Sequence, residues 1–330
     1  MAPHPQRLTV NRRNWALARP FATAREAGTA VDTVVADISD VDSRGRGEGV
    51  PMARFGEDVE SVFATLNAQK GAVSAGLNRE TLQAALPPGA ARNALDCAFW
   101  AIEANRAFCA VADLAGIGTV KPVVTAFTLG LDTPGAMAEL AAAQRARPIL
   151  KLKLGAEGDA ERVQAVRSAV PATRLIVDVN EGWTAAQLEA MLPVLVDCRV
   201  ELIEQPLPAD ADGALSGLRS PIPLCADESC RTRADLDALD GRYAAINIKL
   251  DKAGGLTEAL ALAAEAKRRG LRVMVGGAIG TSLAVAPALL VAQQAEFVDL
   301  DGPLLLASDR VPGLRYEGST IHPSGPEFWG

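Results

Sequence analysis

PILKLKLG (148–155) begins a series of short apolar segments that each end near an ionisable residue. The segments that follow it are RLIVDVN (174–180), VELIEQP (200–206), PLCADES (223–229) and AINIKLD (245–251). Short apolar runs bounded by turn residues are typical of buried strands. The charged positions from Lys153 onward are separated by 22 to 26 residues, enough for one strand, one helix and two loops. The charges therefore lie where parallel strands of a (β/α) barrel end, and such barrels carry their chemistry there.

Eight strand candidates alternate with helical stretches in the segment 119–312, which predicts an α/β fold of the modified TIM-barrel type, (β/α)7β. The candidates are 123–129, 149–154, 174–179, 200–204, 222–226, 244–249, 271–275 and 296–300.

The segment 1–118 lacks this alternation and is predicted to form an α+β domain ahead of the barrel. RLTVNRRNWALA (7–18) and DTVVADISDVD (32–42) indicate antiparallel strands, and helical segments follow them. The turn-rich segment 313–330 is expected to pack back toward this first domain.

Composition favours an enzyme acting on a small molecule. The net charge of −7, without a run of like charges, argues against nucleic acid or an anionic membrane as the main partner. The start of the sequence shows no apolar signal segment, so a cytoplasmic location is expected. Five cysteines without close pairing suggest reduced thiols. The two histidines, His4 and His322, lie near the termini, so proton transfer is left to lysine or carboxylate.

Counting strands places two lysines opposite one another. Lys153 ends the second strand and Lys249 the sixth, half a turn of the ring away, while Asp178, Glu204 and Asp227 end the three strands between them. Three adjacent carboxylates repel unless a cation shares them, and oxygen ligands favour Mg²⁺. The arrangement predicts a metal site between two lysines.

This arrangement suits proton removal next to a substrate carboxylate. The metal would stabilise the enediolate that forms, one lysine would remove the proton from one face, and the other would return a proton to the opposite face. The base lysine must have its pKa lowered toward neutrality, and Lys151, on the same face of the strand as Lys153, could supply the positive charge or contact the substrate carboxylate. Inversion of a stereocentre is the predicted outcome.

Simpler readings exist for single residues. Asp178 and Asp227 could each cap the following helix, and a Lys-x-Lys pair is often a solvated sheet face. Asp299 and Asp301 in DLDGPLL (299–305) end the last strand opposite the metal and could bind a substrate ammonium, or they could stabilise a turn. Five charges at corresponding strand ends favour the catalytic reading.

The motifs together resemble a known family. They are PFATARE (20–26), RFGEDVESV (54–62), KLKLG (151–155), DVNEGW (178–183), IEQPLP (203–208), ADES (226–229), NIKLDKAGGL (247–256) and DLDGPLL (299–305). With these the chain resembles the enolase superfamily, its muconate-lactonizing-enzyme-like subgroup, and within that subgroup the dipeptide epimerases.

The resemblance implies an isomerase that epimerises a dipeptide such as L-Ala-D/L-Glu at the α carbon of its C-terminal residue, with Mg²⁺ as cofactor. It implies that the N-terminal domain caps the barrel and sends a loop over the substrate. The implied roles are metal binding by Asp178, Glu204 and Asp227, acid–base catalysis by Lys153 and Lys249, and substrate binding by Lys151, Asp299, Asp301, Arg25 and Thr128. Arg25 would recognise a glutamate side chain, and Asp299 with Asp301 would bind the dipeptide's amino group.

Two departures and two alternatives accompany the resemblance. Gly277 and Gly280 stand where many subgroup members carry a bulkier residue and a glutamate, so the shape of the pocket is left open. An N-acylamino acid racemase or o-succinylbenzoate synthase would share both lysines but would not need two aspartates opposite the metal. A catalytically silent barrel used for binding would have little reason to keep the lysines. Enolase-type barrels are often symmetric homo-oligomers.

Overall fold

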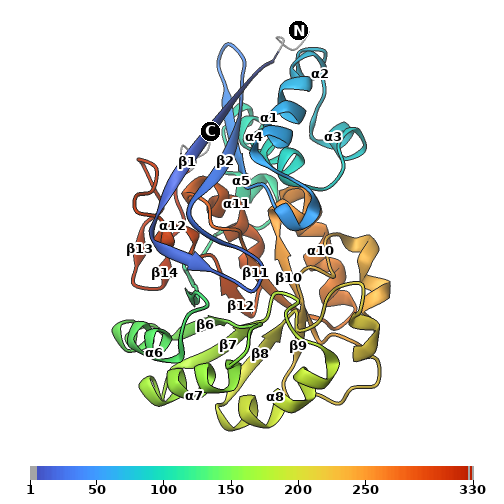
Figure 1. Ribbon diagram of the computed structural model, residues 1–330. Helices are drawn as coiled ribbons and strands as arrows, with labels where there is room; N and C mark the ends of the chain where they lie inside the picture. Colours follow the sequence, from blue (N-terminus) through green and yellow to red (C-terminus); the bar gives the residue numbers. More distant parts are fainter. Residues whose placement is uncertain (1–5, 326–327, 329–330) are drawn as a thin grey trace.

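The computed structural model describes residues 6–325 and 328, and an antiparallel three-stranded sheet opens the chain (Figure 1). Its strands are β1 (Arg7–Ala22), β2 (Ala27–Ser39) and β3 (Arg44–Gly49). β1 and β2 form a hairpin longer than their apolar patterns indicate, and only residues 23–26 separate them. β3 was not predicted, because RGRGEG (44–49) has no apolar alternation.

Glycines in β3 allow this strand to lie directly on a helix. The helices of this part are α1 (Val59–Ala68), α2 (Lys70–Ser74), α3 (Arg79–Ala85), α4 (Ala90–Arg106) and α5 (Val111–Leu114), with a 3-10 turn, η1 (Ala53–Phe55). Gly45, Gly47 and Gly49 share the face of β3 that meets α4, and a Cβ on any of them would overlap a backbone carbonyl oxygen of that helix. α4 is buried along most of its length, as its Ala-rich sequence predicts.

Eight parallel strands form the barrel, which confirms the predicted fold class and strand count. In spatial and sequence order they are β5 (Phe127–Leu129), β6 (Ile149–Lys153), β7 (Arg174–Asp178), β8 (Val200–Glu204), β9 (Leu224–Ala226), β10 (Ala245–Lys249), β11 (Arg272–Gly276) and β12 (Phe297–Asp299). The amide of Ala126 donates to the carbonyl of Val298 over 2.8 Å, which closes the ring. One buried apolar residue from each strand, or from just before β5, fills an interior layer: Ala126, Ile149, Ile176, Leu202, Cys225, Ala245, Met274 and Phe297.

Helices cover the outside of the barrel (Figure 1). They are α6 (Pro134–Ala143), α7 (Asp159–Ala169), α8 (Ala185–Asp197), α10 (Leu256–Arg268) and α11 (Ser282–Ala292), with the 3-10 segments η2 (Asp212–Leu215) and η3 (Arg233–Leu239). The short helices α9 (Leu250–Ala253) and α12 (Gly302–Leu305) follow the carboxyl ends of β10 and β12. A small sheet joins β4 (Val123–Val124) to the hairpin of β13 (Tyr316–Glu317) and β14 (Thr320–Ile321). Within residues 6–325, no helix has both the length and the apolar character needed to cross a membrane.

The N-terminal part lies against the barrel through buried polar contacts. Asp251, just after β10, accepts hydrogen bonds from the amide of Val50 and from Asn93 of α4. Arg92 donates to the carbonyls of Ala253 and Gly254. These contacts fix the sheet and helices of residues 6–116 relative to the strand ends of the barrel.

The tail contacts both parts of the chain. β14 pairs with β4 just before the first barrel strand, and Arg46 of β3 donates to the carbonyl of Phe328 over 2.7 Å. The remaining four residues of the predicted closing segment, 326–327 and 329–330, lie outside the described part of the chain, as does His4.

Candidate active site

The carboxyl ends of the barrel strands bring the predicted charged residues together. Strand register sets Lys153 of β6 beside Asp178 of β7, and Asp178 beside Glu204 of β8. Asp227 follows β9 directly, and Lys249 is the last residue of β10. All of these side chains are buried, and the three neighbouring carboxylates are paired with lysine ammonium groups, which offsets part of the cost of burying them.

The three carboxylates predicted as metal ligands meet at one point. Asp178, Glu204 and Asp227 each offer an oxygen atom within 4.8 Å of the others. Burial, together with the charge of Asp178, raises the pKa of Glu204 to about 7, because the negative charges oppose one another. Glu204 Oε2 and Asp227 Oδ1 are buried without a hydrogen-bond partner among the described residues. Hard oxygen donors with free lone pairs fit a divalent cation such as Mg²⁺.

Lysine ammonium groups lie beside the same carboxylates. Glu204 Oε2 is 2.7 Å from Lys151 Nζ, but the angles there are not those of a hydrogen bond, so the contact is an ion pair. Asn247 fixes the other oxygen of Glu204 by donating to Oε1 over 2.6 Å. The orientation of Glu204 is thus held from one side while Oε2 faces the cluster.

Lys151 is enclosed by acids and lies away from solvent. Its Nζ is 3.0 Å from Asp178, 2.7 Å from Glu204 and 2.6 Å from Asp299. Burial alone would lower the pKa of Lys151, but the three carboxylates raise it well above its ordinary value. The ammonium therefore stays charged and acts as a fixed positive charge at the centre of the site.

Lys153 and Lys249 lie on opposite sides of the carboxylates, as predicted. β6 and β10 are four positions apart in the eight-stranded order. Lys153 Nζ donates to Asp178 over 2.7 Å and to Asn180 over 2.9 Å, and Lys249 Nζ donates to Asp227 over 2.6 Å. Lys153 and Lys249 are 8% and 7% exposed, against 1% for Lys151, so these two amines reach nearer to the mouth of the barrel.

The lowered pKa expected of a base lysine is not what the geometry produces for Lys249. Burial would lower the pKa of Lys249, but the charges of Asp227 and Glu204 raise it above the ordinary value. Positive neighbours alone would lower this pKa, but the ammonium of Lys249 is paired directly with Asp227.

Asp299 and Asp301 both lie at the site, and Thr128 connects them. The amide of Thr128 donates to Asp301 Oδ2 over 2.6 Å, and its hydroxyl donates to Asp299 Oδ1 over 3.2 Å. Burial and the charge of Asp299 raise the pKa of Asp301 to about 7. Asp299 is already paired with Lys151, so Asp301 is the carboxylate with more capacity for an added cation.

Arg25 lies in the β1–β2 turn and reaches the barrel mouth. Its Nε donates to the carbonyl of Asn180 over 3.0 Å, and its Nη2 contacts the carboxylate of Glu181. The amide of Leu131, just after β5, donates to the carbonyl of Ala22, which holds the hairpin against the barrel. The structure therefore brings Arg25 to the rim of the site, beside the residues that follow β7.

Several residues at the site were not predicted. Lys252 donates to the carbonyls of Cys230 and Asn247 and pairs with Asp227 Oδ1 at 2.7 Å, so it fixes the loop that carries Asp227. Glu228 is partly buried beside Asp227, and desolvation with that charge raises its pKa to about 7. Both lie inside quoted motifs, DKAGG and ADES, so the signal was present in the sequence.

The two glycines that leave the pocket shape open have different surroundings. A Cβ at Gly277 would make an ordinary contact with Leu300 at 3.7 Å, so a side chain could be accommodated. At Gly280 a Cβ would approach Val50 at 2.9 Å and Glu48 Oε1 at 3.3 Å. Gly280 therefore permits the close approach of the segment around β3 to the barrel.

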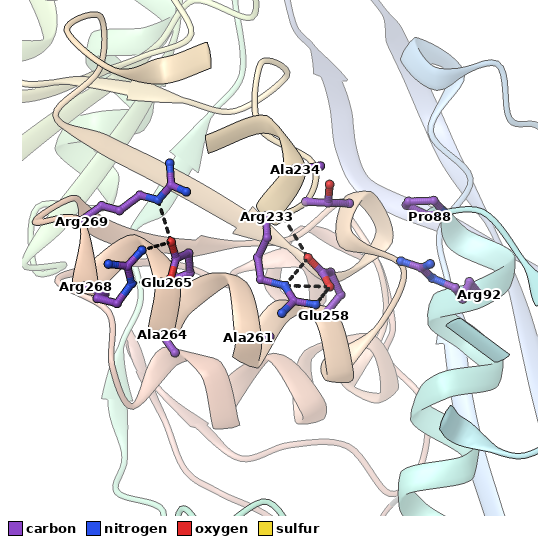
Figure 2. Close-up of a pocket in the computed structure, with 11 residues that line it drawn as sticks. Pro88, Arg92, Arg233, Ala234, Glu258, Ala261, Ala264, Glu265, Arg268 and Arg269 are labelled. Carbon is purple, nitrogen blue, oxygen red and sulfur yellow. Dashed lines mark hydrogen bonds and ion pairs between the residues drawn. The ribbon is translucent and has the colours of Figure 1, made fainter. Parts of the chain in front are cut away.

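A surface pocket of about 830 Å³ lies on the outside of the barrel, between η3, α10 and the segment before α4 (Figure 2). Arg233 pairs there with Glu258, and Arg268 and Arg269 pair with Glu265. Its charges are thus satisfied locally, and it contains none of the residues at the barrel mouth. The chemistry belongs to the strand ends.

The fold and the strand-end residues are those of a barrel enzyme, with buried lysines beside three carboxylates that could hold a metal ion. Residues 136–326 match the family described as "Enolase C-terminal domain-like". Residues 6–116 match "Mandelate racemase / muconate lactonizing enzyme, N-terminal domain". The chain belongs to the mandelate racemase and muconate lactonizing enzyme family of the enolase superfamily.

Relatives cover nearly the whole chain. It is 46% identical to the L-Ala-D/L-Glu epimerase of Escherichia coli (strain K12), over 93% of this chain and 97% of that protein. It is 42% identical to the N-acetyl-D-glutamate racemase of a Pseudoalteromonas species, over 90% of this chain and 95% of that protein.

Solved structures agree in fold. An enolase family member from Agrobacterium tumefaciens, with bound sodium and L-Ala-L-Glu, is 48% identical to this chain and has a TM-score of 0.97. The match covers 99% of this chain and 100% of that chain. A dipeptide epimerase from Enterococcus faecalis V583, complexed with Mg and L-Leu-L-Tyr, is 27% identical with a TM-score of 0.90, 98% of each chain covered. The suspected family is thereby confirmed, and so is the isomerase class of its named relatives.

Proposed function

We propose that the protein is a Mg²⁺-dependent dipeptide epimerase that inverts the α carbon of the C-terminal residue of L-Ala-D/L-Glu or a related dipeptide. The observation that carries the proposal is the position of Lys153 and Lys249, four strands apart on either side of the Asp178, Glu204 and Asp227 cluster. A substrate carboxylate directed at the cluster would present its α carbon between two amines. The similarity to named dipeptide epimerases supports the same activity.

Asp178, Glu204 and Asp227 would hold the metal ion. When bound, Mg²⁺ would neutralise negative charge that develops on the substrate carboxylate as the α proton leaves. The relatives' bound Mg and sodium support a cation here, and three carboxylates favour the divalent one.

Lys153 and Lys249 would exchange roles with the direction of reaction. The lysine on the side of the α hydrogen accepts that proton as a free amine, and the opposite lysine donates one as an ammonium. The amine form at Lys249 becomes more accessible when the negative charge of Asp227 is satisfied by another partner, because that carboxylate raises its pKa. Because the proton leaves from one face of the α carbon and a proton is added to the opposite face, the configuration of that carbon is inverted.

The two ends of the substrate would contact different walls. Asp301, with Asp299, is proposed to hold the free ammonium of the dipeptide, and Thr128 orients both carboxylates. Arg25 is proposed to meet the side chain of the epimerised residue, and Lys151 to supply positive charge near its carboxylate. In this proposal 1–118 forms the cap, 119–312 the catalytic barrel, and 313–330 a segment that ties the two together.

An N-acylamino acid racemase is the second candidate, because the N-acetyl-D-glutamate racemase is 42% identical over 90% of this chain. Such a substrate has no ammonium at the N-terminal side. The buried carboxylates of Asp299 and Asp301 favour the dipeptide.

Substitution of the two lysines tests the mechanism. Lys153→Ala and Lys249→Ala should each abolish epimerisation of L-Ala-L-Glu in the presence of Mg²⁺. The reaction is measured by NMR, which distinguishes the two diastereomers. Lys267→Ala, at an exposed position on α10, is the matched control and should keep wild-type activity. Full activity in either of the first two variants would contradict the two-base mechanism.

A further inference from the structure

The tail hairpin of β13 and β14 is anchored to the start of the barrel. β14 pairs with β4, directly ahead of the first barrel strand (Figure 1). The amide of Thr125 donates to the carbonyl of Ser319 in the hairpin turn over 2.9 Å. Arg147, just before β6, donates to the carbonyl of Gly318 in the same turn over 3.0 Å. Contacts from two separate segments of the barrel therefore fix the hairpin in place.

Side-chain hydroxyls hold the peptide groups on both sides of Leu300. The amide of Leu300 donates to Thr125 Oγ1 over 2.8 Å. The carbonyl of Leu300 accepts from the hydroxyl of Tyr316, in β13, over 2.8 Å. Thr125 is fully buried and Leu300 is 2% exposed, so the loss of either hydrogen bond would leave a buried polar group without a partner. The main chain between Asp299 and Asp301 is thus held at both of its peptide groups.

The hydroxyl of Tyr316 is a constant hydrogen-bond donor. Burial, with the charges of Asp301 and Asp309, raises the pKa of Tyr316 well above its ordinary value. The phenol therefore stays protonated at neutral pH, and its ring packs against the apolar core of the barrel. Because the acceptor is a carbonyl of the main chain, the bond constrains the backbone of Leu300.

The two sets of contacts have different effects on Asp299 and Asp301. Thr128 orients the carboxylate groups, through its amide and its hydroxyl. Thr125 and Tyr316 fix the backbone from which these side chains start. A buried ion pair repays the cost of desolvation only when its geometry is good, so an ammonium site between these carboxylates needs both.

We propose that Tyr316 and Thr125 are positioning residues that hold the peptide groups of Leu300 so that Asp299 and Asp301 are directed at the ammonium group of the substrate. The inference rests on the proposed dipeptide epimerase function and gives the tail hairpin a part in substrate selection. Both residues act through the backbone and lie away from the reacting α carbon. Their loss weakens binding of the ammonium end and leaves the proton transfer unchanged.

Tyr316→Phe tests this role, because it removes only the hydroxyl. We expect the KM for L-Ala-L-Glu to rise about 5- to 20-fold, as for the loss of a buried hydrogen bond, while kcat stays within about twofold. Propionyl-L-glutamate has the shape of this dipeptide without the amino group, and its inhibition constant should change less than about twofold. Tyr243→Phe removes the same group from the other tyrosine of the chain, which bonds to Gln205. This control should leave the ratio of the two constants unchanged.

A pair of substitutions at Thr125 provides a second test. Thr125→Val removes the hydroxyl at nearly constant volume and should cause the same selective rise in the KM for L-Ala-L-Glu. Thr125→Ser keeps the hydroxyl and should keep the wild-type KM. Melting temperatures of all variants show whether each protein is folded at the temperature of the assay.

The outcomes separate the positioning role from the proposed function. A parallel rise in KM and in the inhibition constant, a loss confined to kcat, or an unchanged KM would show that the hydroxyls only support the fold, and would overturn the positioning role. If Tyr316→Phe does not fold, the Thr125 variants decide by the same comparison. If the wild type epimerises no dipeptide, the proposed function fails and the positioning role fails with it.

Discussion

Asp299 and Asp301 are two residues apart, yet their carboxylates have different partners. Asp299 forms an ion pair with Lys151. The side chain of Asp301 accepts a hydrogen bond from the amide of Thr128. Burial and the charge of Asp299 raise the pKa of Asp301 to about 7. A cation beside Asp301 would stabilise its ionised carboxylate and lower that pKa. This is the position that a substrate ammonium would occupy.

Asp301→Asn should therefore separate the two candidate substrate classes. We expect the KM for L-Ala-L-Glu to rise about tenfold or more, since the ammonium loses its charged partner. The KM for N-acetyl-glutamate should stay within about twofold, because that substrate carries no ammonium. Steady-state kinetics with both substrates check this, and exposed Asp197→Asn provides the control. Equal effects on both substrates would remove the ammonium-binding role.

Single residues could be predicted where the sequence marks a strand end. Lys153, Asp178 and Glu204 follow from spacing alone, because strand register in a parallel sheet places equivalent ends side by side. Tyr316 could not be found this way, since its partner is the backbone carbonyl of Leu300 and the two meet only after the tail hairpin folds onto the barrel. The contact depends on three-dimensional packing and leaves no local pattern.

The contact between β3 and α4 depends on the absence of side chains. β3 was missed in the sequence because a strand of alternating glycines carries no apolar signal, and its structural reason is visible only once α4 lies against it. The barrel strands were predictable because they are short, mainly apolar segments that are buried on both faces and end at charged residues, as in ILKLK (149–153) and AINIK (245–249).

Gly47→Ala tests that packing. A Cβ at this position would overlap the carbonyl oxygen of Ala94, so strand and helix must separate, and we expect a loss of about 1–3 kcal/mol or more in the free energy of unfolding. Gly71→Ala is the matched control, because no atom lies within 4 Å of its added Cβ. In helix α2 it should be neutral or stabilise by up to about 1 kcal/mol. Urea denaturation of both variants checks the difference, and an unchanged midpoint for Gly47→Ala would be inconsistent with the close packing.

At the scale of the whole molecule, the barrel holds like charges that only a cation or lysines can balance. Ligands that bind only the folded state stabilise it, by about 2.7 kcal/mol at a concentration one hundred times Kd. We therefore expect Mg²⁺ to raise the melting temperature, measured against choline chloride at equal ionic strength.

Glu204→Gln should reduce that increase, because it removes one of the three oxygen-donor carboxylates from the cluster. The variant also relieves repulsion among the acids, so its melting temperature without Mg²⁺ is expected to equal or exceed that of the wild type. The same Mg²⁺ response in variant and wild type would place the cation elsewhere.

In the proposed reaction, two lysines exchange the α proton of the C-terminal residue of a dipeptide. Incubation of the Mg²⁺-loaded protein with L-Ala-L-Glu in deuterated water, followed by NMR and mass spectrometry of both diastereomers, measures this directly. We expect L-Ala-D-Glu to appear with deuterium at the glutamate α carbon and none at the alanine α carbon. If no epimer forms and no α-deuterium is taken up, with this dipeptide or with a library of others, the two-lysine mechanism is wrong.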